Sequence, residues 1–288
     1  MTPAPPPRCL YLDLDGTLLG RGASLLHDGE GSVSIDGVRG VQACLRANVE
    51  VVLMSGRRRL QVHEDARLLG QSSYIFEAGA CVVLGGGPPS GWADAPPPPA
   101  EEHWLTGALL PGELSIAEQI ERSGAPALLL ELYPGRLEHH EPWHVGREVS
   151  HLFRGLVDVE QVDEVLREHG HGDLRLIDNG AVSRRSPALA DLPQVHGYHL
   201  VPAGASKAAA VALHRRARGY ARGETFAIGD SREDLACASQ VASFWLVANA
   251  VQRDPSIRET AAVHDNVRIT ESGHGGGVYE AVVTTLMT

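Results

Sequence analysis

The sequence predicts an α/β protein built on a doubly wound parallel sheet, with a smaller α+β unit inserted into it. Three short apolar runs, at 8–14, 49–54 and 225–228, are typical of buried parallel strands. A length of 288 residues suffices for two domains. Glycine and proline gather at 85–89 and 96–99, where the pattern changes. We therefore expect a core formed by 1–85 and 195–288, and an inserted unit at 86–194.

Composition excludes several classes of protein. The net charge of −11 argues against a general nucleic-acid binder. No apolar stretch approaches the roughly 20 residues that cross a bilayer, and the proline-rich start lacks the pattern of a signal peptide. The four cysteines are scattered through apolar segments, which indicates buried free thiols. We expect a cytoplasmic protein that has neither a nucleic-acid nor a membrane partner.

The first strand, 8–14, leads into two carboxylates, Asp13 and Asp15. Gly16 lets the chain turn there, so the two side chains can point in different directions. One carboxylate could then attack a phosphorus atom while the other donates and later removes a proton. An isolated Asp-x-Asp is more often a surface turn, so this interpretation needs support from the rest of the chain.

A glycine- and serine-rich flap is expected at 20–35, followed by a helix over 36–48 that Asp36 caps. The strand at 49–54 then ends at Ser55-Gly56-Arg57, and a helix over 58–69 follows. A hydroxyl and backbone amides between a strand and a helix form a natural phosphate cradle. The alternative is that Ser55 only caps the helix.

After strands at 74–76 and 81–84, the pattern in the inserted unit alternates between helix and strand. We expect helices at 113–123 and 159–169, and strands at 127–132, 149–156 and 174–177. Polar side chains of this unit are candidates to contact a substrate: Glu131, His139, His140, His144, Arg147, Arg184 and Arg185. The several histidines could also suggest a metal site, although a solvated histidine-rich loop is the more common case.

Lysine is almost absent from the chain. Of 25 basic residues 24 are arginine, and Lys207 opens an alanine-rich helix expected over 208–218. A cation at a helix N-terminus opposes the helix dipole, so a nearby phosphate or aspartate would explain its position better than helix stability does. Chance placement is the alternative.

The third apolar run, 225–228, precedes an acidic cluster that contains Asp230 and Asp234. Beside Asp13 such a cluster could hold Mg²⁺, which prefers one or two carboxylates, waters and phosphate oxygens. Alone it is more commonly an acidic helix start. A further strand is expected at 241–247 and a last helix after the glycines at 273–277.

Four motifs together resemble the signatures of the haloacid dehalogenase superfamily, whose members mostly transfer phosphoryl groups through an aspartyl-phosphate with magnesium. They are Asp-Leu-Asp-Gly-Thr-Leu-Leu at 13–19, Ser55, Gly-Ala-Ser-Lys at 204–207, and Gly-Asp-x-x-x-Asp at 229–234. The insert resembles the larger cap of the sugar-phosphate phosphatases, and 273–281 resembles mannosyl-3-phosphoglycerate phosphatase-like and sucrose-phosphatase-like proteins. The resemblance implies a Rossmann-like core with a cap, near the Cof-type branch. Ala78 and Glu233 depart from the asparagines that many relatives carry.

By this resemblance, Asp13 would be the nucleophile, Asp15 the general acid and base, and Lys207 the cation that neutralises the phosphoryl group. The phosphoryl group would be bound by Ser55, Gly56 and Arg57. Mg²⁺ would be held by Asp13, the backbone carbonyl of Asp15, Asp230 and Asp234, the last directly or through water.

The resemblance implies a phosphatase for a small phosphorylated metabolite, such as a sugar phosphate or a phosphoglycerate glycoside. One alternative is a phosphomutase of the same fold, which would form a bisphosphate intermediate. The other is a non-catalytic binding protein, against which the intact Asp13, Asp15, Lys207 and Asp230 count.

Overall fold

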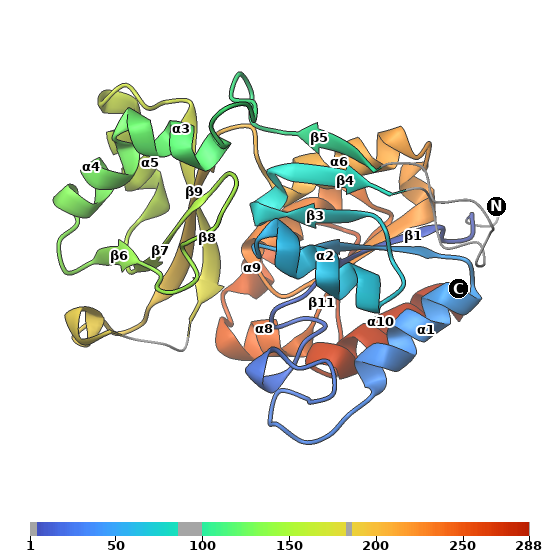
Figure 1. Ribbon diagram of the computed structural model, residues 1–288. Helices are drawn as coiled ribbons and strands as arrows, with labels where there is room; N and C mark the ends of the chain where they lie inside the picture. Colours follow the sequence, from blue (N-terminus) through green and yellow to red (C-terminus); the bar gives the residue numbers. More distant parts are fainter. Residues whose placement is uncertain (1–4, 86–99, 183–185, 288) are drawn as a thin grey trace.

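The computed structural model describes residues 5–85, 100–182 and 186–287. Two units lie side by side (Figure 1), a large one around an eight-stranded sheet and a smaller one around a four-stranded sheet. We call them the core and the inserted unit. No helix within the described residues is long and apolar enough to cross a membrane.

The core sheet has the strand order β12-β11-β10-β1-β2-β3-β4-β5. The strands from β12 to β3 are parallel, and β4 and β5 are antiparallel to their neighbours. Their bounds are β1 Cys9–Asp13, β2 Glu50–Met54, β3 Tyr74–Phe76, β4 Cys81–Leu84, β5 Glu101–Trp104, β10 Thr225–Gly229, β11 Ser243–Leu246 and β12 Val267–Ile269. Because β1 lies between β2 and β10, the carboxyl ends of these three strands meet at one edge of the sheet.

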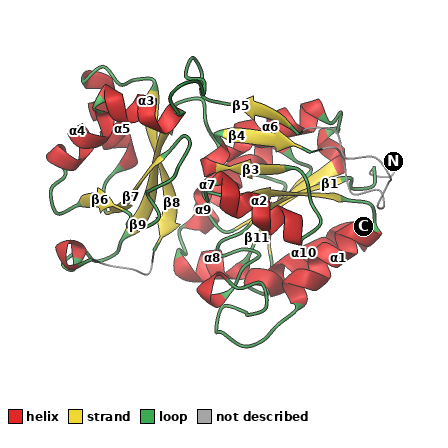
Figure 2. Ribbon diagram, viewed as in Figure 1, coloured by secondary structure: helices red, strands yellow, loops and turns green. Residues whose placement is uncertain are grey.

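Helices cover both faces of the core sheet (Figure 2), as a doubly wound fold requires. In β1, Leu10 and Leu12 pack on the side of α1 Asp36–Arg46, α2 Arg59–Leu68 and α10 His274–Met287. Cys9 and Tyr11 pack on the other side, against α6 Lys207–Ala217, α7 Arg232–Leu235, α8 Ala248–Arg253 and α9 Ile257–Ala261. Short 3-10 helices are η1 Arg21–Ala23, η2 Glu77–Gly79, η3 Pro187–Leu189, η4 Arg222–Glu224 and η5 Ala236–Gln240. This arrangement confirms the predicted fold class.

The sheet of the inserted unit is antiparallel, in the order β6-β7-β9-β8. Its strands are β6 Leu137–His139, β7 His151–Gly155, β8 Leu174–Ala181 and β9 His196–Pro202, and its helices are α3 Ile116–Ser123, α4 Ala125–Leu132 and α5 Val159–Glu168. Side chains of β9 alternate between two environments. Tyr198 and Leu200 pack with Leu129 and Leu166 of the helices, whereas His199 lines a cleft toward the core. The sheet therefore presents one face to its helices and the other to the core.

The strand predicted at 127–132 is wrong, because this segment belongs to helix α4. A short, entirely apolar run cannot be assigned to helix or strand by periodicity. Here Gly124, with a φ of 83°, ends α3, and Pro126 stands in the first turn of α4. Alanine and leucine then favour the helix.

The sheet membership of two strands differs from the predicted domain boundaries. β5, Glu101–Trp104, pairs with β4 in the core sheet, and β9, His196–Pro202, belongs to the sheet of the inserted unit. β5 is a partly exposed edge strand that begins with two glutamates, so it has no apolar run to reveal it. The segment 86–99, with its predicted linker, lies outside the described residues, as do Arg184 and Arg185.

Candidate active site

The predicted motifs come together at the edge of the core sheet where β1, β2 and β10 end. Asp13 is the last residue of β1, Ser55 follows β2, and Asp230 follows β10. The carboxylates of Asp13, Asp230 and Asp234 lie within 4.8 Å of one another, and all three residues are buried. An inner cavity of about 20 Å³, with room for about one water, is lined by residues that include Asp13, Ser55, Asn179, Lys207, Asp230 and Asp234.

Lys207 lies at the centre of this cluster. Its Nζ donates to Asp13 Oδ1 at 2.7 Å and to Asp234 Oδ1 at 2.6 Å, and its side chain is only 2 % exposed. Burial acts to lower the pKa of Lys207, but the two carboxylates outweigh it and hold this pKa well above its usual range. The buried amine is therefore an ammonium group at neutral pH. Ser206, whose Oγ accepts from the Ala209 amide at 3.1 Å, caps the helix that carries it.

The two oxygens of the Asp13 carboxylate differ in their partners. Its buried Oδ2 has no hydrogen-bond partner among the described residues. Burial, and then the neighbouring Asp234, raise the pKa of Asp13 well above its usual range, although Lys207 opposes them. Burial likewise raises the pKa of Asp230 to about 6, against the pull of Arg253. This buried excess of carboxylates over ammonium fits a site for a divalent cation with oxygen ligands.

Asp234 differs from the other two carboxylates because both of its oxygens have protein partners. Oδ1 accepts from Lys207, and Oδ2 accepts from the Ser231 hydroxyl at 2.6 Å and from the amides of Asp230 and Ser231 at 3.2 and 3.1 Å. The arrangement holds Lys207 in place. It favours contact of Asp234 with a metal through water over direct ligation.

Gly16 explains the turn after the first strand. Its φ is 84°, and a Cβ on this residue would lie 2.2 Å from Asp230 Oδ2. The turn also separates the two carboxylates of the motif, as predicted: the side chain of Asp15 is 50 % exposed, whereas that of Asp13 is 7 % exposed. Asp13 therefore points into the inner cavity, and Asp15 lies where solvent can reach it.

Arg57, predicted to bind phosphate, instead contacts two carboxylates. Its Nε and Nη2 donate to the two oxygens of Asp15 at 2.7 and 2.6 Å, and its Nη1 donates to Asp65 Oδ2 at 2.9 Å. Ser55 fits its predicted part better. Ser55 Oγ accepts from the Arg57 amide at 3.1 Å, which leaves its own hydrogen for another acceptor beside the inner cavity.

A cleft of about 760 Å³ lies between the core and the inserted unit. Its lining includes Asp15, Arg57 and Arg253 of the core, and His140, Arg147 and His199 of the inserted unit. Of the predicted substrate contacts, His140 and Arg147 line it, whereas Glu131, His139 and His144 do not. His139 instead stacks on Phe153 and His144, with ring centroids 5.3 and 4.9 Å away.

Glu77 joins the two units. Its buried carboxylate accepts from the amides of Glu148, Val149 and Ser150 at 2.8, 3.0 and 2.6 Å, and from the Ser150 hydroxyl at 2.9 Å. Glu77 itself has a positive φ of 46°. A residue of the core thereby anchors a loop of the inserted unit beside the cleft.

Sequence reasoning missed three residues of the site. Asn179 lines both the inner cavity and the cleft, His199 faces Gly56, and Arg253 donates to Asp230 Oδ2 at 2.9 Å. The one sequence signal was the Asn-Gly pair at 179–180, which is typical of a turn. His199 and Arg253 lie in ordinary strand and helix patterns.

Among the comparisons with known proteins, those with solved structures give matches. No protein-family model and no curated protein matches the sequence. A sucrose-phosphatase from Synechocystis sp. PCC6803, solved in complex with sucrose and phosphate, matches with a TM-score of 0.63 and 16 % identity over 98 % of both chains. A protein from Thermoplasma acidophilum matches with a TM-score of 0.61 and 17 % identity over 99 % of this chain and 100 % of its own. A haloacid dehalogenase-like hydrolase from Bacteroides thetaiotaomicron has a TM-score of 0.58 and 15 % identity, over 96 % of this chain and 99 % of its own.

Proposed function

We propose that this chain, which has the fold of the haloacid dehalogenase-like hydrolases, is a phosphatase that hydrolyses a small phosphorylated metabolite through an aspartyl-phosphate at Asp13. One observation supports this most directly: Asp13 is buried at a strand end, its Oδ1 is held by the only lysine, and its Oδ2 has no described partner. A carboxylate in this setting is oriented and ready to attack an electrophile.

The reaction would proceed in two steps. Asp13 attacks the phosphorus atom, a bond forms between its carboxylate oxygen and phosphorus, and the bond from phosphorus to the leaving oxygen breaks. Asp15 gives its proton to that leaving oxygen. In the second step Asp15 takes a proton from water, the resulting oxygen attacks phosphorus, and the bond to Asp13 breaks to release phosphate.

Groups that are already in place would contact the phosphoryl oxygens and offset part of their charge. Lys207 offsets it from the inner cavity, and the free hydrogen of the Ser55 hydroxyl donates to one of these oxygens. Phosphoryl transfer depends mainly on such positioning and electrostatic stabilisation. The pair with Arg57 places the Asp15 side chain at the border between the inner cavity and the cleft, where Asp15 takes up from solvent the proton that it gives in the first step.

Asp13, Asp230 and the backbone carbonyl of Asp15 would hold Mg²⁺, with Asp234 contributing through water. The unpartnered Oδ2 of Asp13 and the raised pKa values of Asp13 and Asp230 support a cation here. The ion would supply additional positive charge to the phosphoryl oxygens.

A sugar phosphate or a phosphoglycerate glycoside is the substrate class we favour. The cleft of about 760 Å³ is large enough for a leaving group of this size, and its lining is rich in polar side chains. The fold shared with a sucrose-phosphatase agrees with this choice. The four cysteines are buried free thiols, which supports a reducing compartment such as the cytoplasm.

The test is phosphate release from sugar phosphates, a phosphoglycerate glycoside and p-nitrophenyl phosphate, each with Mg²⁺ and with a chelator. We expect magnesium-dependent release by the parent protein and a loss of at least about 10³-fold in Asp13→Asn. The matched control is Asp191→Asn, at an exposed aspartate of the inserted unit. Acid quenching should trap a phosphorylated peptide that contains Asp13.

Two results would contradict the proposal. One is full activity in Asp13→Asn, and the other is no release from any compound by the parent protein. A bisphosphate product would instead identify a phosphomutase.

A further inference from the structure

Arg147 is unlike the other arginines that line the cleft near the inner cavity. Arg57 pairs with Asp15 and Asp65, and Arg253 pairs with Asp230. Among the residues that the structure describes, no carboxylate lies within ion-pair distance of Arg147. A half-buried guanidinium without a counter-ion is a favourable partner for an anion that enters the cleft.

The guanidinium of Arg147 is nevertheless held firmly in one position. Its Nε donates to the Trp143 carbonyl at 3.1 Å, and its Nη1 donates to the Gly56 carbonyl and to Ser150 Oγ, both at 3.0 Å. Within the described part of the chain, Nη2 makes no hydrogen bond. All three acceptors are neutral, so they orient the charge without neutralising it.

The charges around Arg147 do not compensate for its burial. Glu77 attracts it through space, but the carboxylate of Glu77 already accepts from three backbone amides and the Ser150 hydroxyl. Arg58 repels it. Burial dominates and lowers the pKa of Arg147 to about 10.

His199, beside Arg147, supplies no second positive charge. Ser150 gives its one hydroxyl hydrogen to Glu77 Oε2 at 2.9 Å, so Ser150 Oγ accepts from both Arg147 and Nδ1 of His199, the latter at 3.2 Å. In the neutral imidazole of His199, these hydrogen bonds place the ring hydrogen on Nδ1, and Nε2 is then an acceptor. Burial, which lowers the pKa of His199 well below its usual range, agrees with this assignment.

The position of Arg147 indicates which part of a substrate would meet it. Arg147 lines the cleft but not the inner cavity, where Asp13, Ser55 and Lys207 lie. A phosphoryl group bound for attack by Asp13 would lie at the mouth of the inner cavity, next to Asp13, Ser55 and Lys207. An anion that reaches Arg147 therefore belongs to the leaving group.

We propose that Arg147 selects substrates whose leaving group carries its own anionic group, a carboxylate or a second phosphate, in addition to the phosphoryl group that is transferred. This inference rests on the proposed phosphatase function and narrows its substrate class. It favours phosphoglycerate glycosides, and phosphates of acidic or already phosphorylated sugars, over monophosphates of uncharged sugars.

The experiment compares matched phosphate esters. 2-Phosphoglycerate and glycerol 2-phosphate differ by a carboxylate, and fructose 1,6-bisphosphate and fructose 6-phosphate differ by a second phosphate. We expect the parent protein to prefer the more anionic member of at least one pair, and which pair shows the preference distinguishes a carboxylate from a phosphate. In Arg147→Met the ratio of the two kcat/KM values should fall by about 10- to 100-fold, and Arg147→Lys should restore part of it.

The matched control is Arg122→Met, which removes an exposed arginine of α3 and should keep the parent ratio. The proposal is overturned if the parent protein shows no preference in either pair. It is also overturned if Arg147→Met lowers both members of each pair equally, since Arg147 would then act on the transferred phosphoryl group or on the fold.

A binding measurement separates this inference from the proposed function. Calorimetry with the Asp13→Asn protein needs no turnover, and the same compounds serve as ligands. Tighter binding of the more anionic ester, lost in Asp13→Asn/Arg147→Met, supports the role of Arg147 even if the parent protein releases no phosphate. Equal binding of both members of each pair overturns it.

Discussion

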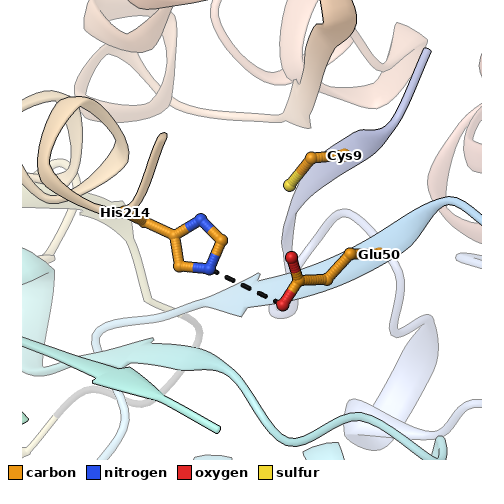
Figure 3. A group of neighbouring side chains, drawn as sticks. All are labelled: Cys9, Glu50 and His214. Atoms are coloured by element: carbon orange, nitrogen blue, oxygen red, sulfur yellow. Dashed lines mark ion pairs between the residues drawn. The ribbon is translucent and has the colours of Figure 1, made fainter. Parts of the chain in front are cut away.

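Glu50 forms a buried charged cluster at the end of the core sheet away from the active site, and its replacement gives a test with a definite magnitude. Figure 3 shows Glu50 with His214 and Cys9, each on a different element. Glu50 Oε1 lies 3.7 Å from His214 Nε2, and the Ser73 and Tyr220 hydroxyls each donate to the carboxylate at 2.8 Å. Burial acts to raise the pKa of Glu50, but His214 and the two hydroxyls outweigh it and lower this pKa from 4.5 to about 2.

The magnitude follows from this shift. The pKa of Glu50 falls from 4.5 to about 2 on folding, and each pKa unit corresponds to about 1.36 kcal/mol. The ionised carboxylate of Glu50 therefore contributes about 3 kcal/mol to the free energy of unfolding at pH 7. Because the folded-state pKa is the lower one, the contribution is complete above the unfolded value of 4.5 and is lost as the pH falls toward 2. About 2 kcal/mol should remain at pH 3.5.

Glu50→Gln has the shape of the protonated acid, so urea unfolding followed by circular dichroism should show the parent protein to be about 3 kcal/mol more stable at pH 7 and 5.5. The gap should narrow to about 2 kcal/mol at pH 3.5. Glu164→Gln, at an exposed position of α5, is the matched control, and its free energy of unfolding should be almost the same as that of the parent protein at each pH.

Two results would refute this reasoning. One is a gap below about 1 kcal/mol at pH 7 or a gap that is constant with pH. The other is dependence on a chelator, because Cys9, Glu50 and His214 are close enough to hold a metal ion instead.

Three further predictions concern the active site. Lys207→Met should abolish phosphate release. It leaves two buried carboxylates without their cation, so urea titrations at pH 7 should show a free energy of unfolding lower by about 3 to 5 kcal/mol. Unchanged stability would contradict this prediction. Arg57→Met should lower kcat about tenfold with little change in KM, because it removes the groups that orient Asp15; an effect mainly on KM would instead indicate phosphate binding by Arg57. Gly16→Ala should destabilise the protein by about 2 kcal/mol or more, since the new methyl group would meet Asp230 Oδ2; a near-normal urea midpoint would show that the turn can adjust.

The elements of the active site could be predicted from sequence because parallel strands share a direction. Residues that follow β1, β2 and β10 must gather at the same edge when those strands are neighbours. Lys207 was recognisable because a cation at the start of a helix is repelled by the helix dipole. The attraction of Asp13 and Asp234 to its ammonium group offsets this repulsion.

The contacts between the two units could not be predicted in this way. Arg147 reaches the Gly56 carbonyl across 91 positions of the chain, and Glu77 reaches the Ser150 amide across 73. The two residues of each pair lie in different segments of the chain, so the helical and strand periodicity of the sequence does not relate them. No local pattern encodes the packing of one unit on the other. The pairing of Arg57 with Asp15, both in the core, was missed for a different reason: a phosphate and a carboxylate attract an arginine equally well.

The single lysine makes the protein a natural probe of its own active site. Any reagent that modifies side-chain amines has one target, Lys207, and the carboxylates that hold this amine protonated and buried also protect it from attack. The rate at which an amine-reactive dye labels Lys207 in the folded chain, measured apart from labelling of the N-terminal α-amino group, would therefore report how often Lys207 leaves Asp13 and Asp234. A lysine-specific protease would cut the unfolded chain into two fragments only where Lys207 is unlabelled, so the fraction of chains left intact would measure the labelling of Lys207.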